Sequence, residues 1–240
     1  MLAMDLGLDG RVALVTGASR GLGLGAARAL AADGAKLVLC ARGADDLEAA
    51  AAELPTETVT VAADVTEPST PGRLVEAATD RFGGLHVLVA NAGGPPQARA
   101  LDVDDDGMRA AVEANMLTSI RLVQASLPPM RRAGYGRICL ITSNAVKQPI
   151  PTLAYSNAAR TGLWAWAKTA AQDLIEEGIT LNLACPGLHA TDRMRQLGFE
   201  GRMGDPDDFG KVVAFLCSQP AGFVSGVAVQ VDGAGTLGLL

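Results

Sequence analysis

The feature that most constrains the fold is a regular alternation of short apolar runs with longer segments of helical periodicity. The seven apolar runs are rich in Val, Ile and Leu, and they cover 11–15, 36–40, 58–63, 85–90, 137–142, 179–184 and 227–231. Between them, apolar residues recur at helical spacing over 21–33, 44–54, 69–82, 105–132, 156–177 and 206–218. Apolar strands joined through helices form parallel sheets that are covered on both faces. The pattern therefore predicts a doubly wound α/β fold, a seven-stranded parallel sheet with helices on both faces.

Composition and the start of the chain exclude several classes of protein. The formal net charge is −6 at pH 7, from 20 basic and 26 acidic residues, and no run of Lys or Arg stands out. We therefore expect no nucleic-acid partner. The first ten residues contain no basic segment, and no stretch has the length of a membrane span, so we expect neither a signal peptide nor a membrane partner. Without a linker or repeat, residues 1–240 are predicted to form one domain of a cytoplasmic protein.

Cysteine and histidine are too scattered to indicate a metal site or a disulfide framework. The four cysteines contain no C-x-x-C pair, and neither His86 nor His189 has a second ligand at metal spacing. We expect reduced, mostly buried cysteines and no bound metal.

A glycine-rich segment follows the first predicted strand directly and opens the first predicted helix. It reads Thr16-Gly17-Ala18-Ser19-Arg20-Gly21-Leu22-Gly23. A helix start offers free N–H groups and a positive dipole end, which suit a pyrophosphate. We expect Gly17 to permit the sharp turn, Gly21 to let the backbone approach the dinucleotide, and Gly23 to allow close helix packing. The segment therefore predicts a dinucleotide site at the first strand–helix turn.

The spacing T-G-x-x-x-G-x-G resembles that of the short-chain dehydrogenase/reductase family, and further motifs extend the resemblance over nearly the whole chain. In order, these are Asp64-Val65, Asn91-Ala92-Gly93-Gly94, Asn115, Pro186-Gly187 and Thr191. The resemblance implies a Rossmann-type domain in which Asp64-Val65 contacts adenine, Asn115 is catalytic, and the loop of Pro186, Gly187 and Thr191 embraces the nicotinamide carboxamide. The cofactor-binding set that follows is Gly17, Ser19, Arg20, Gly21, Leu22, Gly23, Arg42, Asp64, Val65, Asn91, Ala92, Gly93, Pro186, Gly187 and Thr191.

The residues after the second predicted strand favour NADP(H) over NAD(H). An acidic side chain at that point accepts a hydrogen bond from a ribose 2′-hydroxyl and repels a 2′-phosphate. This chain reads Cys40-Ala41-Arg42 there and has no acid. The guanidinium of Arg42 is a fork of donors that suits a phosphate, and Arg20 in the glycine segment is expected to converge on the same position.

The catalytic pattern implied by the resemblance is only partly present. Ser143 after the fifth predicted strand fits the family's serine, which places the tyrosine position at Ser156 and the lysine position at Arg160. A tyrosine occurs one residue early, at Tyr155, so Y-x-x-x-K is absent. Residues of a helix are turned by about 100° from one to the next, so Tyr155 and Ser156 cannot share a helix face, whereas Ser156 and Arg160 do.

Three interpretations remain open, and we expect any turnover to depend more on Tyr155 than on Ser156, because a phenol is a stronger acid than an alcohol. In the first, Tyr155 lies in an irregular first turn and reaches the cleft, with Arg160 supplying positive charge and the ribose contact. In the second, Ser156 or a bound water relays the proton. In the third, reduction is lost and the chain only binds a dinucleotide and a ligand. The Val146-Lys147-Gln148-Pro149 stretch together with S-N-x-x-R resembles a divergent branch of 3-oxoacyl-carrier-protein reductases.

The favoured function is hydride transfer between NADP(H) and a carbonyl or alcohol group of a small or carrier-bound substrate, with Asn115, Ser143, Tyr155, Ser156 and Arg160 as the catalytic set. The alternatives are a dinucleotide-binding regulatory protein and a lyase or isomerase. Only fourteen residues, 192–205, separate Thr191 from Pro206, which predicts a short lid and an open cleft. A homotetramer is expected, because Leu163, Trp164, Trp166 and the apolar end 237–240 would otherwise face water.

Overall fold

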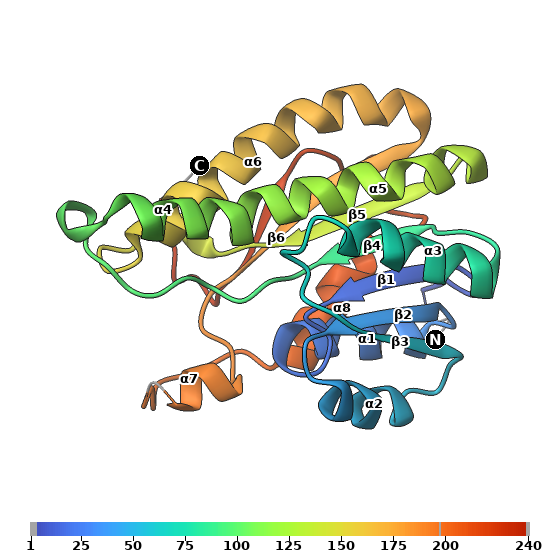
Figure 1. Cartoon of the computed structure of the whole chain (residues 1–240), viewed down its shortest axis with the longest axis horizontal. Coiled ribbons are helices and arrows are strands. Elements are labelled where there is room, and N and C mark those ends of the chain that lie inside the picture. The colour runs from blue at the N-terminus through green and yellow to red at the C-terminus, as the bar shows by residue number, and fades with distance from the viewer. Residues whose placement is uncertain (1–3, 197, 239–240) are drawn as a thin grey trace.

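A computed structural model describes residues 4–196 and 198–238, and it confirms the doubly wound fold. Seven parallel strands form one sheet in the order β3-β2-β1-β4-β5-β6-β7. Figure 1 shows this sheet between two layers of helices. The strands are β1 (Val12–Thr16), β2 (Lys36–Ala41), β3 (Thr58–Ala62), β4 (Val87–Ala90), β5 (Gly136–Ile141), β6 (Ile179–Pro186) and β7 (Ala228–Val231).

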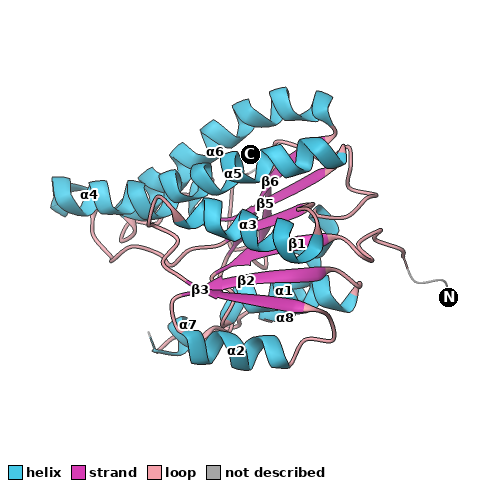
Figure 2. Cartoon of the chain, turned by 45° about the vertical axis from the view of Figure 1, so that its right-hand side comes forward, coloured by secondary structure: helices cyan, strands magenta, loops and turns pink. Residues whose placement is uncertain are grey.

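The helices divide between the two faces of the sheet. One face is covered by α1, α2 and α8, and the other by α3, α5 and α6 (Figures 1 and 2). The α-helices are α1 (Gly21–Ala32), α2 (Ala44–Ala52), α3 (Thr70–Phe82), α4 (Asp105–Val112), α5 (Thr118–Ala133), α6 (Ala154–Leu174), α7 (Asp192–Gln196) and α8 (Pro206–Leu216). The short turns are η1 (Ala100–Asp102), the π-helical η2 (Glu113–Leu117), η3 (Asn144–Val146) and η4 (Ile175–Glu177).

The core lies on both faces of the sheet because successive strand residues point to opposite sides. In β1, Ala13 and Val15 enter the cluster under α1 and α8, while Val12 and Leu14 enter the cluster under α5 and α6. Every residue of β1, β4 and β5 is buried. This double burial is why these strands read as continuous apolar runs and not as alternating ones.

Two glycines let α1 and α8 touch backbone to backbone. A Cβ atom on Gly25 would overlap the carbonyl of Pro206, and one on Gly210 would overlap the carbonyl of Gly25. Because α1 begins in the glycine-rich segment, this close packing fixes the direction of the helix that points at the predicted dinucleotide site.

The long helix predicted over 105–132 is a continuous helical path with a change of winding. It consists of α4, then η2, then α5, and Asn115 lies at the centre of the π-helical turn. A π-turn inserts one extra residue into the helix and re-aims the side chains that follow it, and such turns are frequent at functional sites.

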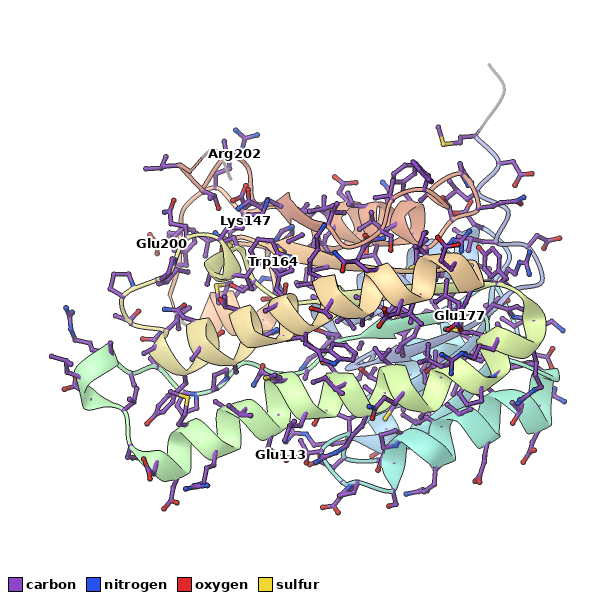
Figure 3. All side chains as sticks on the ribbon, turned by 90° about the horizontal axis from the view of Figure 1, so that it is seen from above. Glu113, Lys147, Trp164, Glu177, Glu200 and Arg202 are labelled. Carbon is purple, nitrogen blue, oxygen red and sulfur yellow. The ribbon has the colours of Figure 1, made fainter. Side chains whose placement is uncertain are left out.

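The structure corrects one expectation about the surface of α6. Leu163 was predicted to face water, but it is only 1% exposed, because it points into the core under α5 and α6. Trp164 and Trp166 are partly buried against the same cluster. Figure 3 shows Trp164 next to Lys147, whose ammonium lies 5.8 Å from the centre of the Trp164 ring. Leu237 is 85% exposed, whereas Leu239 and Leu240 lie outside the described residues.

All four cysteines are free thiols and buried, as the sequence predicts. Burial raises the pKa of the Cys40 and Cys185 thiols to about 11. A thiol must ionise to act as a nucleophile, so these two are unreactive near neutral pH. Within residues 4–196 and 198–238 no helix has both the length and the apolar character needed to cross a membrane.

One histidine at the amino-terminal edge of the sheet makes stability depend on pH. The Nδ1 atom of His86 accepts a hydrogen bond from the backbone N–H of Val12 at 3.0 Å. Burial, together with the nearby charge of Arg11, lowers the pKa of His86 below its ordinary 6.5. The unfolded chain therefore takes up a proton at a higher pH than the folded chain does. The contribution of neutral His86 to the free energy of unfolding is complete above pH 6.5, and it is lost as the pH falls through the lowered pKa of His86.

We therefore expect the melting temperature to fall as the pH is lowered from 7.5 through 6.5. His86→Gln is expected to reduce that fall, because the glutamine amide oxygen can still accept a hydrogen bond from the Val12 N–H but does not titrate. The expected difference is about 2–4 °C, the effect of one hydrogen bond of about 1 kcal/mol in a chain of this size. Calorimetric melting curves at matched pH values measure it. Parallel pH dependences in the two proteins would contradict this role for His86.

Candidate functional site

A cavity of about 570 Å³ opens at the carboxyl ends of β1, β2 and β4. The sheet order places it where the chain connections reverse direction, between β1 and β4, and open parallel sheets bind their ligands at this switch point. A cavity of this size suits a small organic ligand or cofactor. It is lined by Gly17, Ser19, Arg20, Gly21, Ala41, Arg42, Gly43, Asp46, Ala63, Asp64, Val65, Thr66, Asn91, Ala92, Gly93, Gly94, Ala114, Thr191 and Asp192.

The glycine-rich segment has the geometry that its sequence predicts. Gly17 and Gly21 have φ of 60° and 59°, in the left-handed region where a side chain is strained. Gly23 lies so close to the carbonyl of Gly17 that a Cβ atom would overlap it. Arg20 caps α1 without a side-chain hydrogen bond to the helix. The first backbone N–H groups of α1 are therefore not satisfied by a capping side chain, and an anion in the cavity can accept from them.

Asn91 connects the two strands that flank the switch point. Its backbone N–H donates to the Thr16 hydroxyl, and that hydroxyl donates to the Asn91 carbonyl, both at 2.9 Å. The Asn91 side-chain amide donates to the Gly17 carbonyl at 3.3 Å. These bonds hold the glycine-rich segment against the end of β4, so the role of Asn91 in shaping the cavity is clear from its partners.

The wall of the cavity carries charges of both signs, because Arg20, Arg42, Asp46 and Asp64 all line it. Asp64 Oδ1 accepts from the backbone N–H and the hydroxyl of Thr66, at 2.9 and 2.8 Å. These bonds lower the pKa of Asp64, with a smaller contribution from the charge of Arg42. Across the described ranges, neither Arg20 nor Arg42 has a carboxylate within 4.0 Å, so both guanidinium groups are available to an anion.

The loop after β6 reaches the cavity through its second half. The Thr191 methyl lies 3.4 Å from the position of a Cβ on Gly21, which places it over the glycine-rich segment. Gly187 packs instead on β7: its N–H donates to the Val231 carbonyl at 3.1 Å. Of the predicted cofactor-binding residues, the cavity wall includes all but Leu22, Gly23, Pro186 and Gly187.

Arg160 extends from α6 to the carboxyl ends of two strands. It is 7% exposed, and its guanidinium donates to the carbonyls of Ile141 at 3.1 Å and Ala92 at 3.4 Å. Ala92 lines the cavity, so the cation stands directly behind the cavity wall. Ser156 lies one helical turn before Arg160 on the same face and is also buried.

Ser143 begins η3 at the end of β5. Its hydroxyl oxygen accepts from the Ala145 N–H at 3.1 Å, and its O–H donates to Asn144 Oδ1 at 3.4 Å, so it keeps one lone pair for a further hydrogen bond. The first turns of α6 pack on η3. The structure thus brings Ser143 and the Ser156–Arg160 face to the same end of the sheet.

Tyr155 does not reach the cleft in the way that the interpretation with an irregular first helical turn requires. It belongs to the regular first turn of α6 and is 5% exposed. Its hydroxyl accepts a hydrogen bond from the backbone N–H of Asp104 at 3.0 Å, and its ring packs against Ala111 in a small cluster beside α4. The one-residue offset turns its side chain to the α4 side of the helix, so the irregular turn needed to bring it into the cleft does not occur.

Asn115 lies in the π-helical turn next to the cavity-lining Ala114 and is 2% exposed. Both polar atoms of its side-chain amide are buried and have no hydrogen-bond partner within the described part of the chain. Buried amides are almost always hydrogen-bonded, and an orphaned one indicates a place for a water molecule or a ligand.

The segment predicted to be a short lid is short and lies apart from the body. It contains α7, which Figure 1 shows at the lower left, outside the layers of helix and sheet. Leu188, which precedes the lid, is 43% exposed, and Phe199 within it is 37% exposed. The lid segment therefore leaves apolar side chains partly exposed.

Eight residues of the cavity wall lie outside the predicted cofactor-binding set: Ala41, Gly43, Asp46, Ala63, Thr66, Gly94, Ala114 and Asp192. All but Asp46 are immediate neighbours of predicted site residues, so adjacency in the sequence could have indicated them. Asp46 is different, because it stands in the first turn of α2 and only the position of that helix brings it to the cavity.

Comparison with known proteins agrees with this geometry. The family model described as short chain dehydrogenase matches residues 11–200. The 3-oxoacyl-[acyl-carrier-protein] reductase FabG of Vibrio cholerae is 32% identical over 239 residues, covering 95% of this chain and 98% of that protein. Dehydrogenase/reductase SDR family member 4 of Bos taurus is 32% identical over 243 residues, covering 94% of this chain and 87% of that protein.

Among solved structures, the L-sorbose reductase of Gluconobacter frateurii, complexed with NADPH and L-sorbose, matches with a TM-score of 0.90 at 30% identity. The match covers 98% of this chain and 100% of that one. The fold is therefore shared with a reductase that was solved with NADPH.

Proposed function

This chain belongs to the short-chain dehydrogenase family of oxidoreductases, and we propose that it transfers a hydride between NADP(H) and a carbonyl or alcohol group. The observation that carries the proposal is the pair of arginines at the cavity. Arg20 and Arg42 both line the cavity, and among the described residues neither has a carboxylate partner. Guanidinium groups bind phosphate through paired donors, so they fit the 2′-phosphate that distinguishes NADP(H) from NAD(H).

The remaining cavity residues fit the rest of the cofactor. The uncapped start of α1 and the glycine-rich segment suit the pyrophosphate. Arg160 does not line the cavity, and its position behind Ala92 supports the proposal that it holds the nicotinamide ribose. The cofactor supplies the hydride when it is bound. The residues of the chain must orient the substrate and move one proton.

We assign the transfer of a proton to the substrate oxygen to Ser156, or to a water molecule bound to it. In this proposal Asn115 and Ser143 position the water and the substrate. Arg160 shares a face with Ser156 and stabilises negative charge on the substrate oxygen. Because an alcohol is a far weaker acid than a phenol, this route is expected to be slow. Tyr155 holds the start of α4 in this arrangement and does not reach the reacting atoms.

The substrate is expected to be a small or carrier-bound carbonyl compound. Similarity to the reductase of V. cholerae supports a 3-oxoacyl thioester as the first candidate. The open lid supports a substrate that projects from the cleft. We also propose that the protein acts in the cytoplasm as a homotetramer.

A second candidate is a dinucleotide-binding regulatory protein without turnover. The observation that favours it is the absence of Y-x-x-x-K together with the engagement of the Tyr155 hydroxyl at Asp104. A measurement of turnover separates the two candidates, because cofactor binding is expected of both.

For the cofactor, we expect tighter binding of NADPH than of NADH, since two cations meet the 2′-phosphate. Arg42→Asp is expected to reverse the preference, because it replaces a phosphate donor with a carboxylate that accepts from the 2′-hydroxyl. Titration calorimetry with both cofactors measures the two affinities. Equal affinities for NADPH and NADH in the unmodified protein would refute the assignment.

For catalysis, we expect slow oxidation of NADPH, followed at 340 nm, with a panel of ketones that includes β-ketoacyl thioesters. Ser156→Ala is expected to lower kcat about 100-fold or more, as removal of a proton relay does. Tyr155→Phe, the matched control in the same helical turn, is expected to leave kcat nearly unchanged. Loss of turnover with Tyr155→Phe alone would return the role to the tyrosine. If both variants retain full turnover, Ser156 has no part in the reaction, and if no ketone is reduced while NADPH binds, the regulatory candidate is favoured.

For assembly, we expect light scattering at micromolar concentration to give four times the chain mass of 24.6 kDa. The reason is the exposed apolar surface, in which Phe223 is 97% and Leu237 85% exposed, with Trp164 and Trp166 only partly covered. Phe223→Ser is expected to weaken the assembly. A monomer in the unmodified protein would rule the tetramer out.

A further inference from the structure

The cavity that Arg20 and Arg42 line is also lined by a carboxylate that no motif assigns. Asp46 lines the cavity together with both arginines and Gly43. Its Oδ2 atom lies 3.6 Å from the position of a Cβ on Gly43, so the carboxylate leans back toward the beginning of α2. Gly43 directly follows Arg42 in the chain, which brings the acid next to the residue expected to bind phosphate.

The position of Asp46 is one that an anion would otherwise occupy. Gly43 caps α2 without a side-chain hydrogen bond, and Asp46 lies in the first turn of that helix. A helix start attracts negative charge through its free N–H groups and its dipole. Asp46 already supplies a negative charge there. In the described part of the chain it has no cation within 4.0 Å, so its charge is not neutralised by an ion pair.

The other acid of the cavity is held differently. Both hydrogen bonds of Thr66 converge on Asp64 Oδ1 and fix that carboxylate in the turn after β3. Asp46 is exposed, and the described side-chain hydrogen bonds do not restrain it, so it is the acid that can respond to a ligand at the end of β2.

We infer that Asp46 is a specificity-determining residue that opposes the 2′-phosphate and so limits the preference for NADPH over NADH. This inference rests on the proposed dinucleotide function of the cavity. A phosphate monoester carries between one and two negative charges at pH 7, and its repulsion by a carboxylate acts only on NADPH. The same carboxylate can accept a hydrogen bond from the 2′-hydroxyl of NADH. Arg42 and Asp46 thus act in opposite directions on the same ribose.

The test uses the full chain and two probes that differ only in the 2′-phosphate, 2′,5′-ADP and 5′-AMP, so that no turnover is needed. Asp46→Asn removes the charge and keeps the side-chain shape. We expect this substitution to increase the affinity for 2′,5′-ADP about three- to tenfold at low salt, and to leave the affinity for 5′-AMP unchanged or lower. The gain is expected to shrink as the salt concentration rises from 50 to 500 mM, because the interaction is between exposed charges. Titration calorimetry gives each dissociation constant.

Asp45→Asn is the matched control, since Asp45 occupies the same exposed helical turn but does not line the cavity. It is expected to change neither affinity. The inference is overturned if Asp46→Asn leaves the ratio of the two affinities as it is, or if Asp45→Asn changes that ratio equally. An unmodified protein that prefers 5′-AMP would count against the proposed NADP(H) preference, whereas a gain of 2′,5′-ADP binding by Asp46→Asn would still support the role of Asp46. If neither protein binds either probe, both proposals fail.

Discussion

The site depends on the reversal of connection direction between β1 and β4. Chain connections on either side of this point leave the sheet in opposite directions, which opens a crevice at the carboxyl ends of the strands. The crevice becomes a ligand site because α1 starts there without a side-chain cap and with Gly17 and Gly21 in left-handed conformations. The contact of Gly25 with Pro206 and of Gly210 with Gly25 then fixes α1 against α8. This packing keeps the start of α1 directed at the crevice.

The register of α6 determines which side chains meet that crevice. Ser156 and Arg160 are four residues apart and face the strand ends, where Arg160 binds the carbonyls of Ile141 and Ala92. Tyr155 is turned by about 100° from Ser156 and binds the beginning of α4 instead. A shift of one residue in the sequence thus turns the Tyr155 phenol away from the carboxyl ends of the strands. A planar, permanently charged guanidinium remains there, and it can stabilise negative charge but cannot lose a proton as an amine does.

If the cavity binds NADP(H) as we propose, the charges on its wall make the cofactor preference a difference between opposing contacts. Arg20 and Arg42 would attract the 2′-phosphate, Asp46 would repel it, and Asp64 is held in its turn by Thr66. Discrimination between two ligands that differ by one phosphate depends on the balance of these effects. Asp46 also places a negative charge in the first turn of α2, where the helix dipole favours one.

The sequence by itself determined the fold, the glycine-rich segment and most of the cavity wall. Strand and helix periodicity depend on local burial patterns, and the glycines are required by backbone geometry that few other residues can adopt. Only the tertiary structure decided where Asp46, Tyr155 and Leu163 lie. Their surroundings are set by contacts between elements distant in sequence: Asp46 with the end of β2, Tyr155 with α4, and Leu163 with the core under α5. The orphaned amide of Asn115 likewise follows from a π-turn, whose extra residue is accommodated by packing and is not encoded in a periodic pattern.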